Sequence, residues 1–297
     1  MPGTYQTSDG SHISFFGCAS NGGVLSYVDG SQVTMSVVNN YLQPTQVLDR
    51  NGNFVTLSYQ SSANGYNPLS MNSITDTLGR VIQFNYTAPL PGQTYPTLTS
   101  ISEPAMGSGS QAVLNFYYTS PALSYNFSGL FPAIGFTSGY VLHAITNPNT
   151  NSGSVYTYGD YGMIYKVSAR TQMAEPAGDG VEQASATFNY PTSGSTQLTD
   201  APAFTQRTES PGGTYSYSAS TNPGAQTATF TITRPTGSTM ALTRSTDAAS
   251  VANGLLTQTE VDATSGGAML RKAVFSYAND PGGSPQVVTT TTYDDTN

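Results

Sequence analysis

Two aspartates, Asp49 and Asp76, are the residues in this sequence whose type and spacing could do chemistry together. Each is followed after two residues by a glycine, Gly52 or Gly79, and the two aspartates are 27 residues apart. A pair of carboxylates can hydrolyse a glycosidic bond when the two groups face that bond from about 5–10 Å apart. Stacked aspartate turns can also bind Ca²⁺, but such a site needs about six to eight oxygen ligands.

The residues around both aspartates favour a structural role. An aspartate accepts hydrogen bonds from backbone amides two residues further on, and glycine adopts the positive φ that a tight turn needs. An alternating strand follows each glycine, with Leu57 and Tyr59 in the first copy and Phe84 and Tyr86 in the second. We therefore interpret each Asp-x-x-Gly as the turn of a β-hairpin, and we expect neither a split active site nor a calcium site.

Other arrangements that would indicate an enzyme are absent from the sequence. His12 and His143 are the two histidines, and the segment closest to a nucleophile elbow, residues 135–139, carries Thr137 in place of the serine. No zinc-ligand spacing, phosphate-binding loop or dinucleotide-binding motif occurs. We interpret both histidines as ordinary strand residues and expect no catalytic residue, no cofactor and no metal site. A hydrolase is the least favoured function.

Charge and composition exclude several classes of partner. The net charge is −8, and only 9% of the 297 residues are charged, so the clustered Lys and Arg of a nucleic-acid-binding surface are missing. No run of about 18 apolar residues predicts a membrane span, and the first residues do not resemble a signal peptide. Few lysines with many Ser, Thr, Asn and Tyr are typical of secreted or cell-surface proteins, which is the location we expect.

The strand that follows each turn recurs along the whole chain. Ten segments share an apolar residue, any residue and a second apolar residue on one strand face. They are Ile13/Phe15, Val33/Met35, Leu57/Tyr59, Phe84/Tyr86, Phe116/Tyr118, Tyr156/Tyr158, Phe188/Tyr190, Tyr215/Tyr217, Met240/Leu242 and Phe275/Tyr277. Turn residues and a short strand precede each one. Because isolated hairpins cannot bury a face, this repeat predicts an all-β chain of consecutive antiparallel hairpins forming an elongated, curved or spiralling sheet.

The repeat also predicts how the chain is divided. Four parts are expected: N-terminal hairpins over 1–40, the two best repeats with one divergent copy over 41–118, a long aromatic loop over 119–140, and divergent repeats over 141–297. The last part ends like a hairpin that lacks its return strand. Long ordered loops often bind partners, so the candidate binding residues of the loop are Tyr125, Phe127, Phe131 and Phe136.

The two clearest units resemble those of the YD-repeat, or RHS, family. Residues 76–80 (DTLGR) with the strand end 84–86 (FNY), and residues 49–53 (DRNGN) with 57–59 (LSY), match its D-x-x-G-R/N turn and its strand ending in Tyr. The resemblance implies a segment of a spiral β-sheet that winds into a shell, in some relatives around a C-terminal toxin, at a bacterial surface or secreted. The self-cleavage block that follows the array in cargo-releasing relatives has no counterpart in this sequence.

These observations lead to two expectations for function. The first is a non-enzymatic structural segment, a shell wall or surface scaffold, whose partners are other repeats of the same or a longer polypeptide and a toxin cargo. The second is an extracellular adhesin module that binds a surface glycan or protein, since tyrosine rings stack on sugars. Tyrosines at one strand face also form the cross-strand pairs of a sheet, which favours the first expectation.

Overall fold

The computed structural model describes residues 3–7, 11–18, 20–105, 109–122, 139–159, 162–190, 204–280 and 282–294. These residues form 21 β-strands and one short 3₁₀ helix, η1 (Ser62–Asn64). None of the helical structure among them has the length and apolar character that crossing a membrane requires. The chain groups into two compact units. Unit 1 comprises Met1–Ala122, Thr137–Val155 and Ala169–Val181, and unit 2 comprises Leu123–Phe136, Tyr156–Ser168 and Glu182–Asn297.

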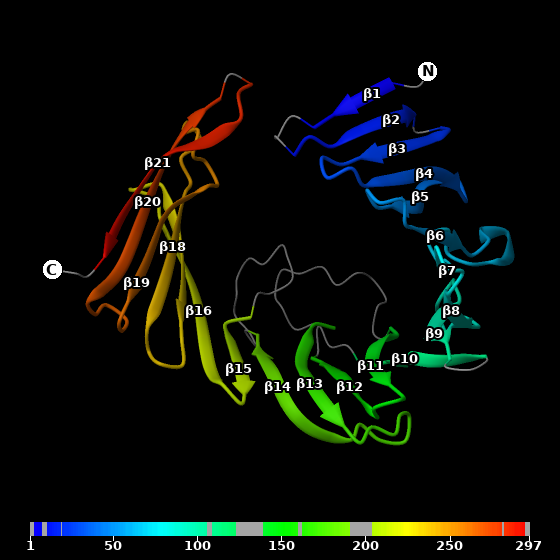
Figure 1. Cartoon of the computed structure of the whole chain (residues 1–297). Coiled ribbons are helices and arrows are strands. Elements are labelled where there is room, and N and C mark those ends of the chain that lie inside the picture. The colour runs from blue at the N-terminus through cyan, green and yellow to red at the C-terminus, as the bar shows by residue number, and fades with distance from the viewer. Residues whose placement is uncertain are drawn as a thin grey trace. The chain divides into compact units, whose positions relative to one another are not determined.

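The strands of unit 1 follow one another in chain order (Figure 1). They are β1 (Gly3–Gln6), β2 (Ser14–Cys18), β3 (Gly22–Ser26), β4 (Gln32–Val38), β5 (Tyr41–Leu48), β6 (Phe54–Tyr59), β7 (Met71–Asp76), β8 (Val81–Thr87), β9 (Thr97–Pro104), β10 (Ser110–Thr119) and β11 (Val141–Asn147). The next two strands, β12 (Ser152–Tyr158) and β13 (Ile164–Thr171), contribute residues to both units. Each strand from β1 to β11 pairs antiparallel with the next.

Unit 2 has the same organisation. Its further strands are β14 (Val181–Asn189), β15 (Gln206–Ser210), β16 (Gly213–Asn222), β17 (Thr227–Thr233), β18 (Thr239–Ser245), β19 (Leu256–Asp262), β20 (Met269–Asn279) and β21 (Pro285–Asp294). From β14 onward each strand is again the antiparallel partner of its successor.

The ten strands expected from the repeat are the ten even-numbered strands, β2 to β20. Ile13 and Tyr190 are the exceptions in detail, because they lie directly beside the ends of β2 and β14 rather than inside them. The odd-numbered strands from β1 to β19 are the opening strands of these ten units. The prediction of an all-β chain of consecutive antiparallel hairpins is therefore confirmed.

A sheet of this kind buries few side chains completely. Among the described residues, the buried hydrophobic side chains are Ala144, Val155 and Met173, with exposed fractions of 0%, 2% and 6%. They form one cluster in unit 1, against which Tyr117 packs. Ala144 on β11 is the cross-strand neighbour of Val155 on β12. Most apolar side chains along the strands are half-buried, so hydrogen bonds and cross-strand pairs carry much of the stability.

Candidate functional site

The carboxylate of Asp49 closes the turn between β5 and β6. Its Oδ1 accepts hydrogen bonds from the amides of Asn51 (2.7 Å) and Asn53 (2.9 Å), and its Oδ2 accepts one from Asn53 Nδ2 (2.8 Å). The backbone of Asp49 also bonds Asn53 and Gly52. Gly52 has φ 88°, the left-handed conformation that this turn needs at its fourth position.

Asp76 makes the same contacts in the turn between β7 and β8. Its Oδ1 accepts hydrogen bonds from the amides of Leu78 and Arg80, both at 2.9 Å. Its Oδ2 accepts a hydrogen bond from Arg80 Nε at 2.6 Å, and Gly79 has φ 77°. Both oxygens of each aspartate are thus bonded within the turn that contains it.

The two turns lie side by side. Thr77 Oγ1 accepts a hydrogen bond from the Phe54 amide (2.8 Å) and lies 2.9 Å from the Phe54 carbonyl oxygen, to which it donates. Asp49 and Asp76 both line a surface recess of about 490 Å³ between the turns. The structure therefore brings together the two acids singled out in the sequence, with their carboxylates engaged in the turns.

Hydrogen bonding also favours the ionised form of both acids. The Asn53 side chain lowers the pKa of the Asp49 carboxyl, and the turn amides help. For Asp76, the amide and then the guanidinium of Arg80 hold the pKa below the ordinary range for an aspartate. A general acid needs the opposite shift, toward a raised pKa. This recess therefore has two charged hydrogen-bond acceptors and no proton donor among its carboxyls.

The candidate strand residues lie in β6 and β8. Leu57 and Phe84 are half-buried and pair with Ile74 and Ile101 of the following strands. Tyr59 Oη donates a hydrogen bond to the carbonyl of Pro44 (2.7 Å), and Tyr86 Oη donates one to the carbonyl of Met71 (2.8 Å). In both cases the acceptor belongs to the opening strand of the same hairpin.

Three further tyrosines make the same bond. They are Tyr118, Tyr190 and Tyr277, which donate to the carbonyls of Leu98, Ile164 and Leu256 over 2.8 to 3.0 Å. Where the ring of such a tyrosine is packed, burial raises the pKa of the phenol, as at Tyr59 and Tyr118. The recurring tyrosine is therefore a bridge that spans its own hairpin.

The candidate binding loop is not placed by the structure. Tyr125, Phe127, Phe131 and Phe136 lie outside the described residues. Their binding role stays a prediction.

The histidines occupy two different settings. His12 lies in the connection before β2 with φ 53°, so its interpretation as a strand residue is wrong. A residue with positive φ cannot continue a strand, because the strand needs the extended conformation. His143 does lie on a strand, β11, but it also belongs to a cluster that the sequence analysis did not find.

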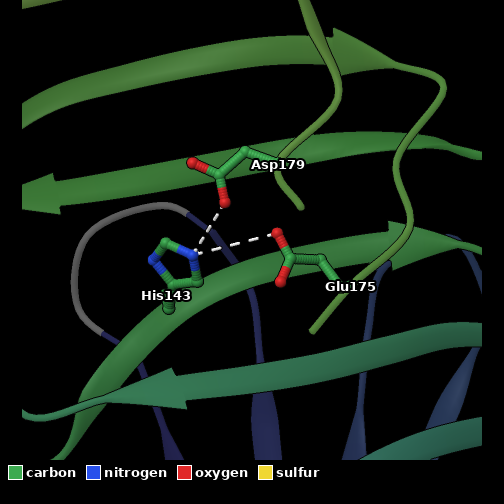
Figure 2. A group of neighbouring side chains, drawn as sticks. All are labelled: His143, Glu175 and Asp179. Carbon is green, nitrogen blue, oxygen red and sulfur yellow. Dashed lines mark hydrogen bonds and ion pairs between the residues drawn. The ribbon is translucent and has the colours of Figure 1, made fainter. Parts of the chain in front are cut away.

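That cluster joins His143 to two acids from the connection between β13 and β14 (Figure 2). His143 Nε2 lies 3.1 Å from Asp179 Oδ1 and 3.8 Å from Glu175 Oε1, and both carboxylates point toward the imidazole. The ligand atoms of all three side chains lie within 4.8 Å of one another. We call these three residues the His143 cluster.

Local backbone bonds place the two acids opposite β11. The Met173 amide donates to the carbonyl of Asn151 in the β11–β12 turn (2.9 Å), and the Ala174 amide donates to the Gly178 carbonyl (3.1 Å). Gly180 follows with φ 73°, and a Cβ there would collide with the Thr171 carbonyl oxygen. This tight return is what carries Glu175 and Asp179 over the strand that holds His143.

Burial differs sharply within the His143 cluster. The side chain of Glu175 is only 4% exposed, against 28% for His143 and 40% for Asp179. Glu175 Oε1 is buried and makes no hydrogen bond. Burial raises the pKa of Glu175, and the neighbouring Asp179 raises it further. Burial also opposes ionisation of Asp179, but its hydrogen bonds to Glu175 and His143 outweigh that effect and lower its pKa.

Sequence reasoning missed this cluster because its members follow no motif spacing. His143 and Asp179 are 36 residues apart, and only the stacking of successive hairpins brings them together. The one local signal is the segment EPAGD at 175–179, in which two acids flank a turn.

Comparison with known proteins finds similar chains among solved structures but none by sequence. The sequence matches no family model, and it matches no curated protein. Among solved structures, one similar chain belongs to the Photorhabdus luminescens Tc holotoxin pore, solved with a point mutant of TccC3, at 9% identity and a TM-score of 0.45. That alignment covers 99% of this chain and 14% of the other. A porin-like protein from Bacteroides uniformis aligns at 12% identity with a TM-score of 0.18, over 97% of this chain and 93% of its own.

Proposed function

We propose that this chain is a non-enzymatic structural segment of an RHS/YD-repeat protein, in which consecutive hairpins form β-shell wall or a cell-surface scaffold. The observation that carries the proposal is how the repeats use their polar groups. In the two clearest repeats, Asp49 and Asp76 bond their own turns, and Tyr59 and Tyr86 bond their own hairpins. The recurring aspartates and tyrosines therefore stabilise the hairpins that contain them.

The same turn recurs beyond the two clearest repeats, which supports a scaffold. Asp280 in the β20–β21 turn accepts bonds from the amides of Gly282 (2.9 Å) and Ser284 (2.8 Å), as Asp49 and Asp76 do in their turns. Repeats that share the same aspartate turn and the same tyrosine bridge can stack on one another without a new type of side-chain contact in each repeat.

The proposal extends to partners and location. Further repeats of the same or a longer polypeptide would continue the hairpin array, and a shell built in this way would hold a toxin cargo. The expected location is outside the cytoplasm, secreted or at the cell surface, with no cofactor required.

A hydrolase panel tests the non-enzymatic part of the proposal. The purified chain is assayed on glycoside, ester, phosphoester and peptide substrates, beside Asp49→Asn and Asp76→Asn. We expect no turnover above a heat-denatured control. Turnover that disappears in either variant would show that the recess between the two turns is an active site.

The coding sequence on both sides of the chain tests the scaffold part. We expect further segments of strand, Asp-x-x-Gly turn and strand ending in Tyr, continuous with this chain. Flanking sequence made only of unrelated catalytic domains would contradict a shell wall. Protease accessibility on intact producing cells then tests the location, since a surface scaffold is cleaved and a cytoplasmic protein is protected.

A further inference from the structure

The buried Glu175 carboxyl shares a hydrogen bond with Asp179, but one of its oxygens, Oε1, has no hydrogen-bond partner among the described residues. The side chain of Glu175 is only 4% exposed. Buried carboxylates are normally paired, hydrogen-bonded or bound to a metal ion. Figure 2 shows this oxygen facing the imidazole of His143, with Asp179 facing the same nitrogen. The three groups converge on one point in space.

The distances suit a metal ion at that point. Bonds of about 2.0–2.1 Å to a tetrahedral ion place neighbouring ligand atoms about 3.3 Å apart. His143 Nε2 and Asp179 Oδ1 are 3.1 Å apart, and His143 Nε2 and Glu175 Oε1 are 3.8 Å apart. A movement of roughly half an ångström would bring Glu175 Oε1 to this spacing from His143 Nε2, and the ligand atoms of all three side chains already lie within 4.8 Å of one another.

Charge and donor type indicate which ion fits. With both carboxyls ionised and the imidazole neutral, the three side chains carry two negative charges; Arg170 acts on both acids from nearby, and a divalent cation between the ligand atoms would neutralise the pair. An imidazole with carboxylates suits Zn²⁺ and neighbouring transition metals, whereas Ca²⁺ and Mg²⁺ take oxygen ligands in larger numbers. Three protein ligands leave a fourth position for water.

We propose that His143 Nε2, Glu175 Oε1 and Asp179 Oδ1 bind one divalent transition-metal ion, with Zn²⁺ as the best fit. The ion fastens the β13–β14 connection to β11, where the Met173 amide already bonds the β11–β12 turn. Its role is therefore structural within unit 1. The site goes beyond the scaffold function and does not depend on it, since it could stabilise a hairpin array of any purpose.

Titration of the metal-free full chain with Zn²⁺ tests the proposal. The protein carries no polyhistidine tag and is treated with a chelator, and calorimetry then measures binding of zinc chloride. We expect one Zn²⁺ per chain and a rise in melting temperature. Parallel titrations with Ca²⁺ and Mg²⁺ are expected to show no comparable binding.

Two variants and one control locate the site. His143→Gln and Asp179→Asn are each expected to weaken Zn²⁺ binding by more than about 100-fold, since even an outer partner of a metal site contributes about 10–100-fold. Asp179 is 40% exposed, so its variant is expected to fold normally, as circular dichroism can verify. His12→Gln removes the other histidine and is expected to bind like wild type.

Three outcomes would overturn the proposal. They are no stoichiometric Zn²⁺ binding by the wild-type chain, equal loss in His12→Gln and His143→Gln, or undiminished binding in a folded Asp179→Asn. The first would mean that the two carboxylates share a proton instead of a metal ion. None of these results would affect the scaffold function, which rests on the turns and tyrosine bridges.

Discussion

Tyrosine hydroxyl groups make one recurring hydrogen bond in this protein, at the end of an even-numbered strand. Near the turn, the two strands of a hairpin pair in the ordinary way, as Leu48 does with Phe54. Further from the turn the backbones of the two strands no longer pair, and the tyrosine side chain bonds the opening strand in place of the backbone. In β6, β8, β10 and β20 the register with the following strand shifts directly before this tyrosine. The tyrosine therefore bonds a carbonyl of the opening strand at the point where the pairing with the following strand is irregular.

Removing one such hydroxyl is expected to destabilise the chain modestly. Tyr118→Phe keeps the ring and deletes the donor to the Leu98 carbonyl, so the free energy of unfolding should fall by about 1 kcal/mol. Urea denaturation followed by circular dichroism measures the change. Tyr41→Phe is the matched control, because Tyr41 is 52% exposed and no change is expected there. Equal effects in the two variants would show that the bridge contributes nothing specific.

The lowered pKa of Asp49 makes part of the stability depend on pH. A carboxyl whose pKa is lower in the folded chain than in the unfolded chain stabilises the fold when it is ionised in both states. For aspartate this means above the ordinary pKa of about 4, and the stabilisation is lost as the pH falls through the lowered pKa of the folded chain. Asp49→Asn keeps an oxygen acceptor but has no charge. Wild type should therefore be more stable than the variant at pH 7, and the difference should vanish at about pH 2.

Urea midpoints of wild type and Asp49→Asn at the two pH values check this prediction. Other carboxyls affect both proteins equally, so the difference between the two midpoints isolates Asp49. A difference of the same size in acid and at neutral pH would mean that the charge of Asp49 does not stabilise the turn.

At the scale of elements, five turns share one backbone hydrogen-bond pattern, and three of them also share the aspartate. In the turns 27–31, 49–53, 76–80, 234–238 and 280–284, the first amide bonds the fifth carbonyl and the fourth amide bonds the first carbonyl. The fourth residue is a glycine with positive φ in each one. Aspartate is replaced by Tyr27 or Arg234 in two of these turns, so among these five turns the glycine is the more general feature.

Substitution of a turn glycine tests whether the turn requires it. A Cβ at Gly79 would meet nothing within 4 Å, so the cost of Gly79→Ala comes from the backbone conformation alone. We expect a loss of about 1 kcal/mol in unfolding free energy, and a smaller loss for Gly79→Asn, because asparagine tolerates the left-handed region. Thermal or urea unfolding measures both. Gly224→Ala serves as control, because Gly224 lies in ordinary contact and outside the left-handed region; a similar loss there would contradict the explanation.

The elements of this fold were predictable because their signals are local. Asp, Gly and the alternating strand lie within about fifteen residues of one another, so the turns and the even-numbered strands follow from sequence alone. The tyrosine bridge was foreseen only as a cross-strand contact, since its acceptor depends on where two strands separate. The His143 cluster was not foreseen at all, because Glu175 approaches His143 only after one hairpin has stacked on the next.

At the scale of the whole molecule, the regularity lies in the order of the strands. Within unit 1 the strands β1 to β11 each pair with their neighbours in the chain, and unit 2 repeats this from β14 to β21. Stability in such an array is approximately a sum of local terms and neighbour interfaces. A change in one hairpin should therefore be felt by its neighbours and fade along the unit.

Hydrogen exchange in a core variant tests this locality inside unit 1. Val155 is 2% exposed and packs with Ala144 and Met173, so Val155→Ala should cost about 1–3 kcal/mol by leaving a cavity in this cluster. Mass spectrometry should find faster exchange in β11 and β12 and unchanged exchange in β2 to β5. If exchange instead rises equally from β2 to β12, unit 1 opens as one cooperative body. In that case the repeats do not unfold independently of one another, although they can be told apart in the sequence.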